Sequence, residues 1–265
     1  MLIHNLLEVV AILNSMPKII RNNVPKKYHH MLARIYFKSR TFFYIGDSVI
    51  CPCCDKSFRE FSVDTKSPGK SCPECGCYER SRLLWFYLKY RTNFLTDKLK
   101  VLHIAPEYSL QKKFKSLSNL EYISADLNSS LAMIKMDITN IQYKNNYFDV
   151  IICYHVLEHI IEDQKAMSEL FRVLKPHGWA IIQSPIDSKR EMTFEDQNIN
   201  TPEDREKYYG LYDHVRIYGL DYKNRLERAG FNVIIDEYAK TLDDYTLKKY
   251  GIDKNENIYL CKKCP

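Results

Sequence analysis

The sequence predicts an α/β protein built around a mostly parallel sheet, and two patterns carry this prediction. From residue 100 onward, short apolar runs alternate with helical patterns, which is typical of βαβ units. Runs such as "VIICY" are apolar without interruption, which indicates a sheet covered by helices on both faces. Seven strands are expected, in "KVLHIA", "EYISADL", "LAMIKMDI", "FDVIICYHV", "GWAIIQSP", "FNVIIDEY" and "NIYLC".

The chain divides into four regions by composition. We expect a basic helical segment over 1–44, a small cysteine-rich lobe over 45–78 and a linking helix within 79–99. The main domain follows over 100–265, and a polar insertion at 187–218 precedes its sixth strand.

The composition is that of a soluble globular protein, with 45% hydrophobic and 27% charged residues. No run of 18 apolar residues is present, so no membrane-spanning helix is expected. The opening "MLIHNLLEVVAIL" has no basic flank and is predicted to be an amphipathic helix, not a signal peptide. Together with nine cysteines, this favours a reducing, cytoplasmic location and metal binding over disulfides.

The charge is unevenly distributed along the chain. Residues 1–100 contain 17 Lys/Arg and 8 Asp/Glu, which gives +9, and residues 101–265 contain 22 and 25, which gives −3. This asymmetry favours an anionic partner, such as a phosphorylated substrate, an anionic membrane surface or RNA. The alternative is a solvated helix face. The stretch "YHHMLARIYFKSRTFFY" mixes basic and aromatic residues, but its apolar positions also fit helical packing.

Two cysteine pairs have the spacing of a structural zinc site. "CPCC" and "CPEC" give C-x2-C, seventeen residues, C-x2-C, so Cys51, Cys54, Cys72 and Cys75 can supply four thiolates. A closed tetrahedral site of this kind stabilises a fold and leaves no position for chemistry. Cys53 and Cys77 could replace one of these ligands, and Cys153 is expected in the core. Cys261 and Cys264 repeat the spacing without a partner pair.

Polar residues stand where the predicted strands end. In open α/β sheets the ligand lies beyond the carboxyl ends of the strands, and here these ends carry Glu107, Asp126, Asp137 and His155. Asp126 follows Glu107 by nineteen residues, which is the expected spacing for a carboxylate that binds ribose hydroxyls. The alternative is that these acids only end strands or cap helices.

These segments resemble class I S-adenosylmethionine-dependent methyltransferases (methyltransferase type 11-like) over residues 100–263. "FDVIICYHVLEHI" and "ELFRVLKPHGWAIIQSP" look like that family's fourth- and fifth-strand motifs, although His177 replaces one glycine of "RVLKPGG". The resemblance implies a seven-stranded Rossmann-like sheet whose last strand is antiparallel. It also implies S-adenosylmethionine as cofactor, bound by His103, Ala105, Glu107, Asp126, Leu127, Asp137, Ile138, Tyr154 and His155.

A narrower resemblance covers almost the whole chain. "CYERSRLLW", "LHIAPE", "VLEHI" and "DHVRIYG" are similar to motifs of bacterial methyltransferases with a zinc-ribbon head, often associated with surface-glycan biosynthesis. In that group the glycine-free first loop is also built on "APE". Ala105 is the smallest alternative to glycine where the main chain must approach a ligand. Glu107 could pair with the cofactor's ammonium group and would repel a dinucleotide pyrophosphate.

Three histidines are candidates to line the methyl site or act as base. His155 follows the fourth strand, His159 lies one helical turn further, and His214 belongs to the polar insertion. We expect His155, and His214 with Asp213, to be catalytic and His159 to be structural. Arg216 suits a carboxylate or phosphate of the acceptor. Arg80 and Arg82 are candidates for the same role or for an ion pair between lobe and domain.

The leading hypothesis is therefore a cytoplasmic methyltransferase (EC 2.1.1.-). It would act on a hydroxyl, or an amine, of an anionic acceptor such as a sugar phosphate or a glycan or lipid-linked intermediate. Peripheral contact with an anionic membrane would fit the basic N-terminal half. One alternative is an RNA base methyltransferase that uses the zinc ribbon to bind rRNA or tRNA. The other is a zinc-stabilised scaffold without catalytic activity.

Overall fold

A computed structural model describes residues 39–63 and 69–265 of the chain. The expected helical segment at 1–44 therefore falls mostly outside the described residues. Its last part contains the 3-10 helix η2, Phe42–Tyr44. No described helix is long and apolar enough to cross a membrane.

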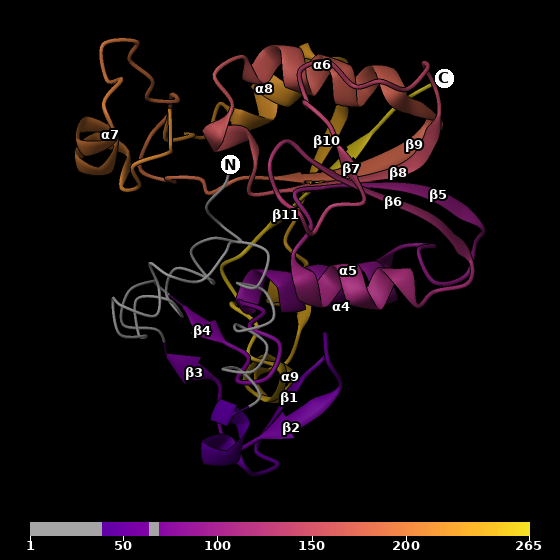
Figure 1. The fold of residues 1–265 in the computed structure, drawn as a ribbon, viewed down its shortest axis with the longest axis vertical. Coiled ribbons are helices and arrows are strands. Elements are labelled where there is room, and N and C mark those ends of the chain that lie inside the picture. Colours follow the sequence, from indigo (N-terminus) through magenta and orange to yellow (C-terminus); the bar gives the residue numbers. More distant parts are fainter. Residues whose placement is uncertain (1–38, 64–68) are drawn as a thin grey trace.

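The central sheet has seven strands in the order β10-β11-β9-β8-β5-β6-β7 (Figure 1). Parallel pairing joins five of them, and β11 is antiparallel to both of its neighbours. This arrangement confirms the expected α/β sheet with an antiparallel last strand. The strands are β5 (Leu99–Ile104), β6 (Leu120–Asp126), β7 (Ile134–Lys135), β8 (Phe148–Tyr154), β9 (Leu174–Gln183), β10 (Asn232–Asp236) and β11 (Ile258–Lys262).

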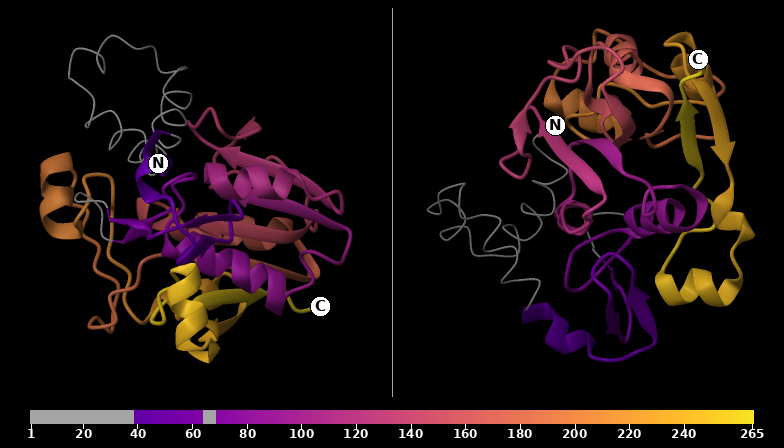
Figure 2. Two further views of the ribbon diagram at one scale, coloured as in Figure 1. Left: turned by 90° about the horizontal axis from the view of Figure 1, so that it is seen from below. Right: turned by 90° about the vertical axis from the view of Figure 1, so that its right-hand side faces the viewer.

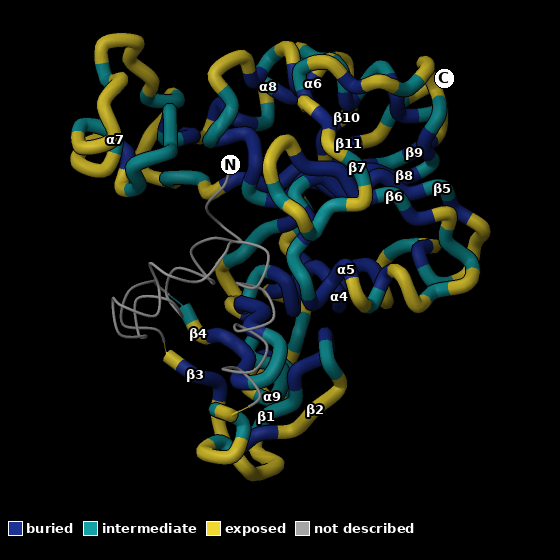
Figure 3. The backbone as a smooth tube through the Cα atoms, viewed as in Figure 1, coloured by how far each residue is buried: buried dark blue, intermediate teal, exposed yellow. Residues whose placement is uncertain are grey.

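Helices cover both faces of the sheet, as the continuous apolar strands predicted. The helices are α4 (Glu79–Arg91) and α5 (Tyr108–Lys115) on one face, and α6 (Asp163–Val173) and α8 (Tyr222–Arg228) on the other (Figure 1). Alternate residues of each strand supply the two cores, with Val150 and Ile152 on the α4 side and Ile151 and Cys153 on the α6 side. Figure 3 shows the sheet as the most deeply buried part of the fold.

The cysteine-rich lobe joins the core on one face of this sheet and has no separate core. It contains two short hairpins, β1 (Val49–Cys51) with β2 (Lys56–Phe58) and β3 (Ser62–Val63) with β4 (Lys70–Ser71). Its buried residues belong to the same apolar cluster as α4, α5 and the sheet. The composition of the chain changes at residue 78, as expected, but the described lobe residues and the sheet domain pack around one shared core.

A C-terminal segment that the sequence analysis did not identify also packs on the lobe. Between β10 and β11 the chain forms η4 (Tyr238–Thr241) and α9 (Asp244–Tyr250), and α9 lies against β1 (Figure 2). Asp243 caps α9 by accepting from the Thr246 main-chain N–H, and Gly251 ends it in a left-handed conformation.

The polar insertion at 187–218 extends from the side of the domain (Figure 1). Its helix α7 (Pro202–Tyr209) starts at Thr201, whose hydroxyl accepts from the Asp204 main-chain N–H, and ends at Gly210. Two isolated bridges, Ile186 with Tyr218 and Phe194 with Ile217, hold its ends together.

Arg82 fastens the lobe, α4 and the C-terminal segment to one another. Its side chain is fully buried. It donates to the main-chain carbonyls of Cys77 at 2.8 Å, Lys70 at 3.0 Å and Gly251 at 2.7 and 3.0 Å. The guanidinium also stacks over Phe61 at 4.0 Å from the ring centroid. These four hydrogen bonds link three chain segments through one buried guanidinium, so the packing of the segments depends on them.

We predict that Arg82→Met lowers the free energy of unfolding by about 3 kcal/mol or more, because buried carbonyls lose their charged donor. Urea denaturation followed by circular dichroism would measure it. Arg59→Met is the matched control, since the Arg59 side chain is 64% exposed, and it should change stability by less than about 0.5 kcal/mol. Equal stability of the two variants would contradict the role given to Arg82.

Candidate functional site

The first element of the site is the sheet edge at which β5, β6 and β8 end. These strands are neighbours and parallel, so the residues that follow them meet at one edge. Ala105 follows β5 and donates its main-chain N–H to the Ala125 carbonyl at 2.8 Å. His155 follows β8 and donates its main-chain N–H to the Gln183 carbonyl at 2.8 Å.

The glycine-free loop has a glycine-type backbone. Ala105 has φ of 49°, and His155 has φ of 56°, so both lie in the left-handed region that L-residues seldom adopt. The turn that a glycine-rich loop makes after the first strand is therefore made here with alanine. The sequence argument that Ala105 stands in for glycine agrees with this geometry.

Asp126 lies at the end of β6 and is 2% exposed. Its Oδ1 accepts from the main-chain N–H groups of Asn128 and Ser129, each at 2.7 Å. These two bonds fix the carboxylate, and no described residue donates to Oδ2. A fixed carboxylate with an oxygen to spare can accept from ribose hydroxyls. The neighbouring Leu127 is 36% exposed.

Three other predicted cofactor residues have contacts of their own. Asp137 is exposed, and its Oδ1 accepts from the N–H and hydroxyl of Thr139 at 2.8 Å, which makes it a turn residue. Ile138 is buried. His103 lies inside the core, with Nδ1 2.9 Å from the Tyr122 hydroxyl, and burial lowers its pKa to about 3. The His103 ring therefore stays neutral beside α5 and does not reach the edge.

Glu107 pairs with the linking helix α4. Its carboxylate accepts from the Ser81 hydroxyl and lies 3.5 Å from the Arg80 guanidinium. The two side chains are 14% and 16% exposed, so both charges are partly open at the edge. Such a pair is complementary to an amino acid zwitterion, because the carboxylate can bind an ammonium and the guanidinium a carboxylate. The buried Tyr154 lies next to this pair, with its hydroxyl 3.5 Å from the Arg80 main-chain carbonyl.

A cluster of three histidines and two carboxylates follows β8. The 3-10 helix η3 (Leu157–His159) turns back so that Oε1 of Glu158 lies 3.5 Å from Nδ1 of His155. Nδ1 of His159 lies 2.8 Å from Oδ2 of Asp213. The rings of His159 and His214 meet edge to face, with centroids 4.7 Å apart. All the catalytic candidates of the sequence analysis are thus brought to one place.

The insertion is bonded to η3, and this brings Asp213 and His214 into the cluster. The Val215 main-chain N–H donates to the Glu158 carbonyl at 2.9 Å. Arg216, which is 4% exposed, donates to the carbonyls of Leu157 at 2.9 Å, Ile160 at 2.5 Å and Ile161 at 2.9 Å. Its Nε–H donates to the Glu195 carboxylate at 2.8 Å.

These contacts correct two of the predicted acceptor residues. Arg216 and Arg82 are buried, and their donors bind main-chain carbonyls and Glu195. They hold the insertion and the lobe in place, so neither guanidinium is open to an acceptor. Arg80 is the predicted acceptor residue that remains at the edge.

The charges of the cluster are set by its members. Burial alone would raise the pKa of the Glu158 carboxyl. The neighbouring His155, His159 and His214 lower it by more than burial raises it, so the pKa of Glu158 lies well below its usual value. Burial lowers the pKa of His159, but Asp213 and Glu158 outweigh this and raise it. Burial is the main cause that lowers the pKa of His214. Glu158 is therefore ionised and His214 neutral at neutral pH.

Two residues have places in the site that the sequence did not predict. The sequence offers Glu158 only as a cap or a partner near His159, but Glu158 is 2% exposed, accepts from the Ser184 hydroxyl at 2.9 Å through Oε2 and lies beside His155. Its place inside "VLEHI" was the available signal. Glu256 comes from the loop before β11, and its Oε1 accepts from the Gln183 side-chain amide at 3.3 Å. Burial raises the pKa of Glu256, and the nearby His155 and Arg80 lower it by less. Nothing in the local sequence indicates this position.

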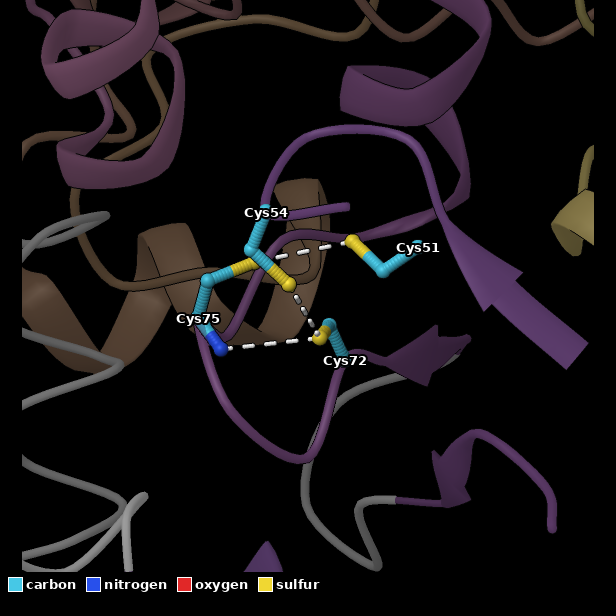
Figure 4. Close-up of side chains that lie close together, drawn as sticks. All are labelled: Cys51, Cys54, Cys72 and Cys75. Atoms are coloured by element: carbon cyan, nitrogen blue, oxygen red, sulfur yellow. Dashed lines mark hydrogen bonds between the residues drawn. The ribbon is translucent and has the colours of Figure 1, made fainter. Parts of the chain in front are cut away.

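The cysteine cluster has the dimensions of a four-thiolate site. Ligand atoms of Cys51, Cys54, Cys72 and Cys75 lie within 4.8 Å of one another, and two Sγ–Sγ pairs, Cys51–Cys75 and Cys54–Cys72, are 3.7 Å apart (Figure 4). Four sulfurs at the Zn–S distance of 2.3 Å form a tetrahedron with edges of about 3.8 Å. The residues therefore fit zinc.

Two further thiols touch this cluster. Cys77 Sγ lies 3.3 Å from Cys51 Sγ, and Cys51, Cys53 and Cys77 form a second close group. The expectation that Cys53 and Cys77 could exchange with a ligand remains a prediction. Cys153 and Cys261 are buried in strands, and Cys264 is exposed.

Part of the chain is similar to known proteins. Residues 100–182 match the family model of a methyltransferase domain. No curated protein matches the chain. One similar solved structure is an S-adenosylmethionine-dependent methyltransferase from Mesorhizobium loti, with 12% sequence identity, a TM-score of 0.49 and coverage of 68% of this chain and 97% of that chain. A SAM-dependent methyltransferase from Archaeoglobus fulgidus has 18% identity, a TM-score of 0.46 and coverage of 69% of this chain and 94% of that chain. A SAM-dependent methyltransferase from Aquifex aeolicus has 16% identity, a TM-score of 0.41 and coverage of 63% of this chain and 82% of that chain.

The family match lies on the strands that form the candidate site. It runs from β5 through β9 and so includes Ala105, Glu107, Asp126, His155 and Glu158. Similarity to a methyltransferase domain is therefore found over the residues that carry most of the candidate site.

Proposed function

We propose that this protein transfers a methyl group from S-adenosylmethionine to a hydroxyl, or less readily an amine, of an anionic acceptor. The observation that carries the proposal is the histidine–carboxylate cluster at the end of β8, next to the edge formed by Ala105 and Asp126. A methyltransferase needs a cofactor pocket at that edge and, for a hydroxyl acceptor, a base beside it.

The residues at the edge fit the cofactor. Asp126 would bind the ribose hydroxyls, and the left-handed turn at Ala105 would let the main chain approach the ligand. Glu107 and Arg80 would bind the ammonium and carboxylate of the amino acid end. The cofactor, when bound, supplies a methyl group on a positively charged sulfur.

His155 is the proposed base. Imidazole accepts protons near neutral pH, and a carboxylate beside it stabilises the protonated ring. Glu158 lies 3.5 Å from His155 Nδ1 and is ionised, so it can play that part. His214 lines the same cluster as a neutral imidazole, and Asp213 is bonded to His159.

The acceptor is proposed to be a sugar phosphate or a glycan or lipid-linked intermediate. The charge of +9 over residues 1–100 supports an anionic partner. Peripheral contact with an anionic membrane and a cytoplasmic location belong to the same proposal. The same charge would suit RNA, which is the second candidate.

The cysteine cluster is proposed to hold structural zinc. A site with four thiolates has no open position, and the lobe around it shares its core with α4 and α5. Zinc would therefore stabilise the face of the sheet on which Glu107 and Arg80 meet.

We predict that Asp126→Asn weakens binding of S-adenosylhomocysteine by about 10- to 100-fold, because a charged acceptor for two hydroxyls is lost. Isothermal titration calorimetry would measure this. Asp97→Asn is the control, since that carboxylate is exposed and held in a turn before β5, and this variant should bind S-adenosylhomocysteine as wild type does. Binding that is unchanged in Asp126→Asn, or absent in folded wild type, would contradict the proposed cofactor site.

We predict that His155→Gln lowers kcat of methyl transfer by about 100-fold or more while S-adenosylhomocysteine binds as before, because only the base is lost. Labelled methyl donor would be incubated with sugar phosphates, lipid-linked sugars and RNA in parallel. His177→Gln, at an exposed site distant from the cluster, is the control. Transfer to RNA alone would replace the glycan proposal with the second candidate.

We predict that the purified protein holds one zinc ion per chain in the lobe, and that Cys72→Ser lowers its zinc content and its thermal stability together. Zinc would be measured by elemental analysis and stability by circular dichroism. Cys264→Ser is the control, because Cys264 is exposed and outside the cluster. Full stability of a Cys72→Ser protein without zinc would contradict the structural role.

A further inference from the structure

The histidine–carboxylate cluster contains a set of metal-ligand atoms separate from the cysteines. One carboxylate oxygen of Glu158 and one ring nitrogen each of His159 and His214 lie within 4.8 Å of one another. We propose that Glu158, His159 and His214 bind a divalent transition-metal ion.

The spacing is close to that of a coordinated ion. Ligand atoms at about 2.1 Å from a metal lie about 3.0 to 4.2 Å from one another, depending on the geometry. Side-chain shifts of about 1 Å or less would bring the three atoms from their present spacing to that range. The main chain need not move.

The second observation is the orientation of His159. Its Nδ1 lies 2.8 Å from Oδ2 of Asp213 and 3.3 Å from the Asp213 carbonyl. A hydrogen atom on Nδ1 can be donated to the Asp213 main-chain carbonyl, beside the carboxylate, and leaves the lone pair on Nε2 for a ligand. This carboxylate–histidine arrangement accompanies metal-ligating histidines, where it fixes the tautomer and strengthens the ligand.

Glu158 has the surroundings of a ligand as well. Its carboxylate is buried, and Ser184 donates to Oε2 at 2.9 Å. Among the described residues, no lysine or arginine forms an ion pair with it. A buried carboxylate without a permanent cation is costly, and a divalent ion would supply the missing charge.

The segments that carry the ligands are held together independently of any ion. Glu158 and His159 belong to η3, and His214 belongs to the insertion. The Val215 N–H and the Arg216 guanidinium bind the carbonyls of η3, so the two segments cannot separate freely. The site is therefore preformed.

The donor set selects the kind of ion. Two imidazoles and one carboxylate suit Zn²⁺, Fe²⁺, Co²⁺ or Mn²⁺, whereas Mg²⁺ and Ca²⁺ prefer oxygen alone. Three protein ligands leave coordination positions open. If the proposed function holds, an oxygen of the acceptor would occupy an open position beside His155. The binding of the ion itself does not depend on that function.

Mn²⁺ is a suitable probe, because it binds nitrogen and oxygen ligands and competes poorly for four thiolates. The full-length protein, with zinc in the cysteine site, would first be treated with a weak chelator. Mn²⁺ would then be titrated and free Mn²⁺ followed by electron paramagnetic resonance. We expect one Mn²⁺ per chain in wild type, and a loss of affinity of at least about tenfold in His214→Ala and in Asp213→Asn.

His177→Ala is the matched control, because it removes an exposed imidazole outside the cluster and should bind Mn²⁺ as wild type does. His159→Gln and Glu158→Gln extend the series if they fold. His214 is half-buried, so its variant tests the site even if the others do not fold. Equal Mn²⁺ binding in wild type and His214→Ala, or no saturable binding, would overturn the proposal.

Calorimetry with S-adenosylhomocysteine on the same proteins separates this proposal from the proposed function. Loss of Mn²⁺ binding with unchanged S-adenosylhomocysteine binding supports a metal site beside an intact cofactor site. Mn²⁺ binding by wild type without S-adenosylhomocysteine binding would leave the metal site in place and overturn the methyltransferase assignment.

Discussion

The buried guanidinium of Arg82 is the constraint on which the arrangement of the chain depends. From α4 it donates to two carbonyls of the lobe and to the Gly251 carbonyl after α9. The fit is tight, since a Cβ on Gly251 would come within 2.4 Å of Phe61 and 3.0 Å of Arg82. Because α4 also carries Arg80 and Ser81, which hold Glu107, the cofactor edge is positioned from the cysteine lobe through a single helix.

The sheet could be predicted from the sequence because burial on both faces leaves a clear apolar signal. β5, β6 and β8 lie where the apolar runs predicted them, and their ends define the site. Strand β9 begins at Leu174, earlier than the expected "GWAIIQSP", because the chain passes through "KPHG" with His177 in a left-handed conformation. The α9 helix was missed, although Asp243 and Gly251 are ordinary start and stop signals for it.

The roles of individual polar residues were harder to predict than the fold. His103 and Arg216 have the residue types of a ligand site, but one ring lies in the core and one guanidinium binds main-chain carbonyls. Such contacts come from segments distant in sequence, so no local pattern contains them. The sequence predicted catalytic roles for His155, and for His214 with Asp213, and a structural role for His159, and the fold brings all four residues together. Their actual pairing, His155 with Glu158 and His159 with Asp213, required the coordinates.

Three positions show that the fold, and not the presence of glycine, determines where the backbone is left-handed. Ala105, His155 and His177 all have φ between 49° and 62°, where glycine would be free of strain. Each costs about 1 kcal/mol or more in that conformation. Ala105 and His155 lie at the candidate site, where contact with a ligand can offset the strain of the left-handed backbone. The His155 ring already lies beside the Glu158 carboxylate. A histidine held in this way points from the end of β8 with little conformational freedom, which is what a base or a ligand at that position requires.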